Sequence, residues 1–156
     1  MSASADTFPH GIHPPERKLT ADAAIERLAW PDEVIVLLSQ HIGAPAKAIV
    51  AKKQQVQRGE PIAEAGSFVS VPMHAPITGT VTQVDRALNP RGEMAPAIII
   101  RRDPDANQEE AWSSPRDLDA MSPDDLAKAV QDTGVVGLGG AAFPTHVKLK
   151  EIGRAH

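Results

Sequence analysis

A glycine-rich segment late in the chain has the residue types that could bind a phosphate group. Residues 137–142 read Gly-Leu-Gly-Gly-Ala-Ala, and Lys148 follows shortly after them. Glycines lack a Cβ and let backbone N–H groups approach a phosphate closely, while a lysine adds a positive charge. The spacing matches neither a Walker loop nor a Rossmann turn. From the residues alone, a phosphate-binding loop and a small-residue packing turn both stay open.

Metal and nucleophile chemistry find little support in the residue types. The sequence has no cysteine, which excludes disulfides, thiolate zinc sites and cysteine-ligated iron–sulfur clusters on this chain. Prolines around His10 and His13 prevent a helix, so these two side chains cannot lie on one helix face. For His41 and His74 we favour hydrogen-bonded turn histidines over a metal site. No Ser/His/Asp or paired-carboxylate arrangement stands out, so we predict neither catalytic nor metal-binding residues.

Charge and hydropathy exclude two further classes of protein. The net charge is −4 and no basic run exceeds two or three residues, so no nucleic-acid footprint is visible. No apolar stretch approaches the roughly 20 residues that span a bilayer, and Met1–Asp6 lacks the pattern of a signal peptide. We therefore expect a cytoplasmic chain of the ordinary globular class.

Short strands joined by turns must form the body that positions the glycine segment. Fourteen prolines and eleven glycines interrupt the chain too often for a helical bundle. Strands are expected at Val34–Leu38, Ile49–Val50, Ile62–Ala63, Phe68–Val71, Thr80–Val84 and Ala97–Arg101. Gln57–Glu60 and Asn89–Gly92 have the composition of turns. The sequence thus predicts a mainly β fold.

A weak internal repeat lies inside this block. Residues 41–50 resemble residues 72–81, and each copy contains an Ala-Pro pair before a Val. Such a repeat predicts two similar half-sheets related by a pseudo-twofold axis. Chance similarity over a few small residues is the alternative.

The segments around the β block divide the chain into further parts. We predict an extended Pro/His-rich arm at 1–33, the β domain at 34–102, a polar linker at 103–121 and a last part at 122–156. Within the arm, Ala21–Leu28 is expected to form a short helix that begins after Thr20. Trp112 is expected to pin the linker to the body.

A helix directly before the glycine segment is the element with the strongest local signals. Ser122 is an expected N-cap with Pro123 at the first helical position, and Asp124 and Asp125 oppose the positive end of the helix dipole. Gly134 is the expected stop.

Residues 56–62 and 75–81 together resemble the biotinyl/lipoyl carrier fold, a flattened β-barrel with two similar halves. A carrier needs a lysine on the hairpin between these motifs, which falls near Ser67-Phe68. No lysine lies between Lys53 and Lys128. The resemblance supports the fold and excludes the carrier activity.

Four separated motifs then resemble one family. They are Phe8–Lys18, Leu38–Ala46, His74–Val81 and Gly134–Leu149. Together they look like the RnfC subunit of the Rnf electron transport complex, an ion-translocating NAD:ferredoxin oxidoreductase. The resemblance runs from Phe8 to about Leu149 and identifies the amino-terminal part of such a subunit.

The resemblance implies a fold and a cellular role. It implies a barrel-sandwich hybrid domain, followed by the start of an α/β nucleotide-binding domain similar to the FMN- and NADH-binding flavoprotein of complex I. Such subunits are peripheral proteins on the cytoplasmic face of the inner membrane. Their partners are the other Rnf subunits, NADH and, indirectly, ferredoxin, and their electron transfer is coupled to ion transport.

The resemblance also implies a set of cofactor-binding residues. Those that would contact FMN or NAD(H) are Gly137, Gly139, Gly140, Ala141, Phe143 and Lys148. Two positions depart from the complex I pattern: Leu138 stands where arginine is usual, and Ala142 stands where glycine is usual. The full-length family carries 4Fe-4S clusters, which this cysteine-free chain cannot ligate.

Residues 150–156 do not resemble the family's continuation, so we expect a chain truncated before the iron–sulfur segments. We expect its last part to pack poorly, with Val135, Val136 and Phe143 lacking partners. The chain alone is then expected to be inactive in redox chemistry. The alternative is a non-catalytic docking module of the complex, with the proline-rich arm as its contact.

Overall fold

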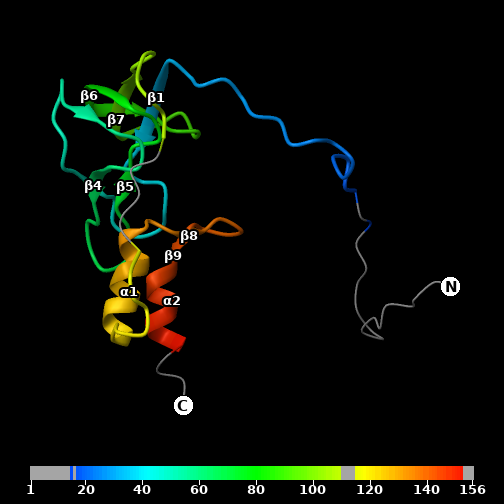
Figure 1. Ribbon diagram of the computed structural model, residues 1–156, viewed down its shortest axis with the longest axis vertical. Coiled ribbons are helices and arrows are strands. Elements are labelled where there is room, and N and C mark those ends of the chain that lie inside the picture. Colours follow the sequence, from blue (N-terminus) through cyan, green and yellow to red (C-terminus); the bar gives the residue numbers. More distant parts are fainter. Residues whose placement is uncertain (1–14, 16, 110–114, 153–156) are drawn as a thin grey trace. The chain divides into compact units, whose positions relative to one another are not determined.

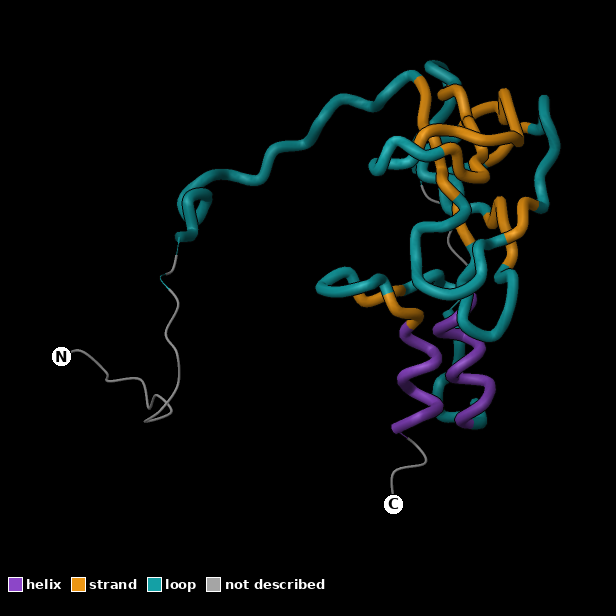
Figure 2. Tube along the Cα trace, turned by 180° about the vertical axis from the view of Figure 1, so that it is seen from behind, coloured by secondary structure: helices purple, strands orange, loops and turns teal. Residues whose placement is uncertain are grey.

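The computed structural model describes residues 15, 17–109 and 115–152 (Figures 1 and 2). Backbone contacts divide the chain into two units, Met1–Trp30 and Pro31–His156. The motif Phe8–Lys18 and the pair His10 and His13 fall wholly or largely outside the described residues.

The described part of the first unit contains a turn and no helix. Residues 19–22 form the turn, in which Ala23 N donates to Thr20 O at 3.1 Å. The helix expected at Ala21–Leu28 is therefore wrong. Ile25 is 99% exposed and Leu28 is 93% exposed, so no packing supports a helix there. Helices this short are marginal without a tertiary partner.

Seven strands in two sheets build the second unit's β part, here called the β body (residues 33–102). The larger sheet has the order β1-β7-β6-β3 and the smaller has the order β2-β4-β5. The strands are β1 (Glu33–Leu37), β2 (Lys47–Ala48), β3 (Gln55–Val56), β4 (Pro61–Glu64), β5 (Met73–His74), β6 (Gly79–Leu88) and β7 (Met94–Arg102). All their pairings are antiparallel.

Aliphatic side chains from both sheets share one core. Val81 pairs with Ile100 across the long β6–β7 hairpin, and the smaller sheet contributes Ile62 and Ala63. These four residues are completely buried. The mainly β class predicted from the sequence is confirmed, and the expected strands at 34–38, 62–63, 80–84 and 97–101 all lie within or overlap observed strands.

Two expected strands are wrong. The strand expected at Ile49–Val50 lies earlier, at β2. Residues 68–71 form a loop between β4 and β5. Their backbone makes hydrogen bonds to other segments and does not pair with a neighbouring strand. Ala44 N donates to Val69 O at 3.1 Å, and Val71 N donates to His41 Nε2 at 3.4 Å.

Both predicted turns are present. Gly59 has a φ of 90° in the first, and Glu60 N donates to Gln57 O at 3.0 Å. In the second, Gly92 has a φ of 81° and its N donates to Asn89 O at 2.9 Å. Glycine is favoured at both positions because the left-handed φ is strained for other residues.

Helix α1 (Pro123–Asp132) begins and ends as its sequence predicts. Ser122 Oγ accepts from Asp125 N at 3.2 Å, and Asp125 Oδ2 accepts from Ser122 N at 3.2 Å. This reciprocal capping box satisfies two backbone donors at the helix start. Gly134 follows the helix with a φ of 73°.

A second helix packs beside α1 (Figures 1 and 2). Helix α2 (Thr145–Ile152) follows a two-stranded hairpin of β8 (Val136–Gly137) and β9 (Phe143–Pro144). Lys150 Nζ lies 3.3 Å from Asp124 Oδ1, and Val147 is buried. The expectation of poor packing holds for Val135, which is half exposed, but not for this helix pair.

The segment after β7 contains no helix or strand in its described residues 103–109 and 115–121. Gln108 nevertheless ties it to the β body: its side chain accepts from Thr78 N at 2.9 Å, and its carbonyl accepts from Arg58 at 3.1 Å. Trp112, the expected anchor, lies outside the described residues. Among the described helices, none has the length and apolar character needed to cross a membrane.

Candidate cofactor-binding site

The glycine segment forms the tip of the β8–β9 hairpin, called the glycine hairpin below (residues 136–144). Gly137 pairs with Phe143, which turns the chain back on itself. Gly140 N donates to Gly137 O at 3.4 Å within the turn. Leu138, which replaces the usual arginine, is 85% exposed at the tip. The hairpin therefore presents its glycine backbone away from the core.

Packing within the described chain does not require Gly139 or Gly140. A methyl group at either position would meet no atom of the described residues within 4 Å, and neither residue has a left-handed φ. A small-residue packing turn would place neighbours against these positions. The open backbone therefore argues against a packing turn and leaves room for another molecule to approach.

Ala142 carries backbone strain in this hairpin. Its φ is 53°, in the left-handed region that glycine adopts without steric cost. The resemblance gives glycine as the usual residue at this position, and the conformation supplies the physical reason.

Lys148 reaches back from α2 to the base of the hairpin. Its Nζ would lie 3.1 Å from a Cβ on Gly137, and it lies 5.9 Å from the centre of the Phe143 ring. The structure thus brings Gly137, Phe143 and Lys148 together, and Gly139, Gly140 and Ala141 follow along the same hairpin tip. Gly140 N already donates to Gly137 O, so the groups of this arrangement that could bind a phosphate are the Lys148 ammonium and the backbone N–H groups of Gly139 and Ala141.

Two side chains hold the helix pair to the loop between β4 and β5. His146 Nε2 lies 2.8 Å from Phe68 O, and Gln131 Nε2 donates to Ser70 O at 3.1 Å. The Phe68 ring meets the imidazole edge to face, with centroids 5.6 Å apart. These contacts were not predicted from the sequence, because each joins residues more than 60 positions apart and no local pattern indicates them.

A third contact reaches the hairpin itself. Ile42 N donates to Ala141 O at 3.3 Å. Its neighbour His41 is buried, donates from Nδ1 to Ile42 O at 3.0 Å and accepts at Nε2. His41 is therefore a hydrogen-bonded turn histidine, as the sequence predicts.

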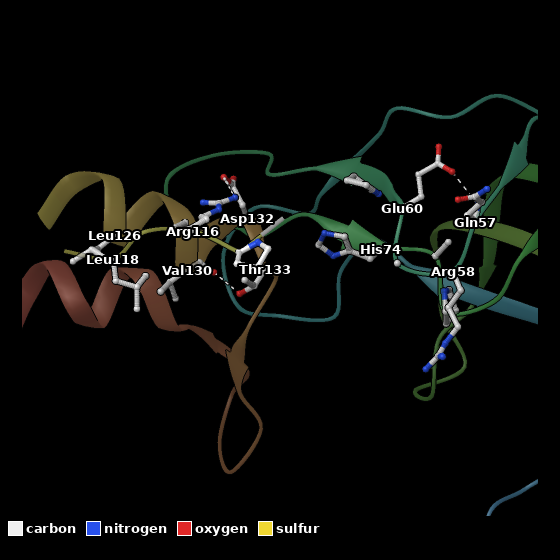
Figure 3. A pocket seen from close by; sticks show the side chains of 16 residues that line it. Gln57, Arg58, Glu60, His74, Arg116, Leu118, Leu126, Val130, Asp132 and Thr133 are labelled. Atoms are coloured by element: carbon white, nitrogen blue, oxygen red, sulfur yellow. Dashed lines mark hydrogen bonds and ion pairs between the residues drawn. The ribbon is translucent and has the colours of Figure 1, made fainter. Parts of the chain in front are cut away.

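A cavity of about 1140 Å³ lies between the β body and α1 (Figure 3). Its wall combines Leu118 of the segment before α1 and the α1 residues Leu126 and Val130 with the polar residues Arg58 and His74. No sequence pattern indicates this cavity, because its walls come from segments far apart in the chain.

His74 lies between Thr133 at the end of α1 and Glu60 of the β body (Figure 3). Desolvation by burial lowers the pKa of His74 below its ordinary value of 6.5, although a backbone hydrogen bond and the charge of Asp132 act in the opposite direction. The ring therefore favours its neutral form at neutral pH. Among the described residues, no three His, Cys, Asp or Glu side chains gather as a metal site.

The chain matches the family described as RnfC Barrel sandwich hybrid domain over residues 6–105. It is 39% identical to the C subunit of the Na(+)-translocating ferredoxin:NAD(+) oxidoreductase complex of Acetobacterium woodii, over 96% of this chain and 34% of the relative. It is 35% identical to the C subunit of the proton-translocating ferredoxin:NAD(+) oxidoreductase complex of Clostridium ljungdahlii, over 92% of this chain and 32% of the relative.

A third relative is the C subunit of the ion-translocating oxidoreductase complex of Edwardsiella ictaluri. It is 33% identical over 91% of this chain and 18% of its own length. The chain thus spans about a third or less of the curated relatives it matches.

Proposed function

Because this chain belongs to the RnfC barrel sandwich hybrid domain family, we propose that it serves in an ion-translocating ferredoxin:NAD(+) oxidoreductase complex. Its role there is to provide the β body and the first phosphate-binding loop of an FMN and NAD(H) site. Support comes from the names of the relatives, from the two sheets around one core, and from the glycine hairpin.

One observation carries the cofactor proposal. No described atom packs against the tip of the glycine hairpin at Gly139 and Gly140, and Lys148 lies at its base. Backbone N–H groups of Gly139 and Ala141 would bind the phosphate, Gly140 would let it approach because it has no side chain, and Lys148 would neutralise part of its charge. Gly137 leaves space for Lys148 Nζ, and Phe143 offers an apolar ring beside that ammonium. A bound FMN would supply the exchange between hydride and single-electron transfer.

Binding of FMN and of riboflavin, which lacks the phosphate, tests this proposal. FMN should bind the chain at least about tenfold more tightly, because charge-assisted hydrogen bonds to the phosphate are worth more than one kcal/mol. Lys148→Gln should remove most of that preference, whereas Lys52→Gln, at an exposed position on the β body, should not. Equal affinities for the two flavins in the unaltered chain would contradict the proposal.

The chain by itself is predicted to lack NADH oxidation activity. It has no cysteine to hold an iron–sulfur acceptor, and a hairpin with two helices encloses only part of a cofactor. Purified chain with FMN and NADH should reduce an artificial acceptor no faster than free FMN does. A rate clearly above that background would overturn this prediction.

The cavity favours a second function, in which the chain docks another subunit of the complex. Its apolar wall includes Leu118, which is largely exposed. Leu118→Asp should reduce co-purification with the other subunits without changing the melting temperature. Leu88→Asp, at an exposed position on β6, is the matched control. The proline-rich arm, the other proposed contact, can be tested by deleting residues 1–14.

The proposed location is the cytoplasmic face of the inner membrane, reached through these partner subunits. Ferredoxin would then exchange electrons with other parts of the complex. Membrane fractions should contain the chain when the partner subunits are co-expressed and lose it when they are omitted. Retention without partners would contradict this attachment.

A further inference from the structure

The buried histidine of α2 has one defined hydrogen-bonding role. His146 is 2% exposed, and its Nε2 lies 2.8 Å from Phe68 O. A carbonyl oxygen only accepts, so Nε2 must carry the proton and donate it. Nδ1 is buried and has no hydrogen-bond partner among the described residues. The imidazole is therefore a single-donor group aimed at one backbone oxygen.

That backbone oxygen belongs to a loop that residues of the β body hold in place. The next residue, Val69, accepts from Ala44 N at 3.1 Å, and a methyl group on Gly43 would meet Val69 O at 2.0 Å. Val71 N donates to the buried His41. Close backbone approach and two hydrogen bonds thus hold the acceptor in place on the β body.

The same bond marks the side of α2 that faces the β body. Successive helical residues turn by about 100°, so His146 and Lys148 point to nearly opposite sides, while Lys150 lies on the side of His146. Lys150 Nζ accordingly lies 5.5 Å from the centre of the Phe68 ring. Lys148 is exposed and reaches Gly137. With His146 bonded to Phe68, Lys148 must face the glycine hairpin.

We propose that His146 is a positioning residue for Lys148: its hydrogen bond to the Phe68 carbonyl sets the rotation of α2 and holds the lysine at the base of the glycine hairpin. The part of this proposal that concerns phosphate rests on the function proposed above. The part that concerns the rotation of α2 does not.

Two substitutions at the position separate the hydrogen bond from the volume of the side chain. His146→Leu fills the space but leaves Phe68 O without its donor. His146→Gln carries an amide N–H that can replace Nε2. Hydrogen exchange of the α2 amides and the rate of amine labelling at Lys148, relative to the exposed Lys52, measure the position of the helix without any ligand.

Leu should speed exchange of the α2 amides by about tenfold, since a buried acceptor is left unpaired. It should also change the labelling rate of Lys148 and weaken the preference for FMN over riboflavin. Gln should restore exchange, labelling and preference toward the values of the unaltered chain. Gln131→Leu, which removes the contact of α1 with Ser70 O, should leave Lys148 labelling unchanged.

If Leu leaves exchange and labelling as in the unaltered chain, or if Gln restores neither, the proposal is overturned. If Leu prevents folding, His146→Asn gives the same test, because its amide is too short to reach Phe68 and should behave like Leu. Equal binding of FMN and riboflavin by the unaltered chain would remove the phosphate function alone. Exchange and labelling would still decide whether His146 positions Lys148.

Discussion

Ala142 has the left-handed φ of 53° on a residue other than glycine. Ala142→Gly should stabilise the glycine hairpin by about 1 kcal/mol, because glycine adopts this conformation without the Cβ clash. Hydrogen exchange of the β8 and β9 amides measures this free energy. Ala141→Gly, at a position without a positive φ, should instead destabilise the hairpin slightly. The same effect at both positions would contradict the strain argument.

Substitution by alanine should have different effects on stability at two glycines. Gly140→Ala should leave the melting temperature unchanged, since a methyl group there meets nothing within 4 Å among the described residues. Gly79→Ala should destabilise the fold by about 1–3 kcal/mol, because its Cβ would lie 2.0 Å from Arg101 O in the β6–β7 ladder. Thermal melts of both variants test this. Destabilisation by Gly140→Ala would favour the interpretation of the glycine segment as a packing turn.

At the scale of elements, the capping box makes the start of α1 sensitive to acid. Side-chain and backbone hydrogen bonds with Ser122 lower the pKa of Asp125 below its ordinary value of 3.8. A lowered folded-state pKa adds stability above pH 3.8, and this is lost as the pH falls through the folded value. Hydrogen exchange of α1 amides below pH 4 should quicken in the unaltered chain. Ser122→Ala should reduce that pH dependence, and an unchanged profile would contradict the assignment.

Elements with local signals could be predicted from the sequence, and those without could not. α1 has an N-cap, a proline and a terminal glycine, β6 has alternating apolar residues and β7 has an apolar run, so these elements were predicted at least in part. The helix at 21–28 failed because its apolar residues Ile25 and Leu28 pack against nothing in the part of the chain that the structure describes. α2 was not predicted because its stability comes from α1 and the loop at 68–70, which no pattern within eight residues reveals.

For the molecule as a whole, the junction between the β body and α1 should weaken as the pH falls. Burial lowers the pKa of His74, so the unfolded chain binds more protons than the folded chain just below pH 6.5. Stability is then lost as the pH falls from 6.5 through the lowered value. Melting temperatures between pH 7.5 and 5 should show this loss, and His74→Gln should reduce it. An equal loss in the variant would assign it to other groups.

The candidate site was predictable only in part. Gly137, Gly139, Gly140 and Lys148 stand out by type and spacing, because a candidate phosphate-binding loop is recognised from residues that are close in sequence. His146 and Gln131 do not, since their role depends on carbonyl groups 78 and 61 residues away. The position of these carbonyls follows only from the folded path of the β body. The cavity beside His74 could not be predicted from the sequence for the same reason.

The loop at 68–72 contacts the helix pair mainly through its main chain. Phe68 O and Ser70 O accept hydrogen bonds, and a methyl group on Gly134 would lie 2.9 Å from Pro72 O. Every residue type offers such a carbonyl. These three main-chain contacts therefore depend on the backbone path of the loop and not on its side chains, although the Phe68 ring also packs against His146. An insertion or deletion in this loop should therefore disturb the junction even where every side chain is kept.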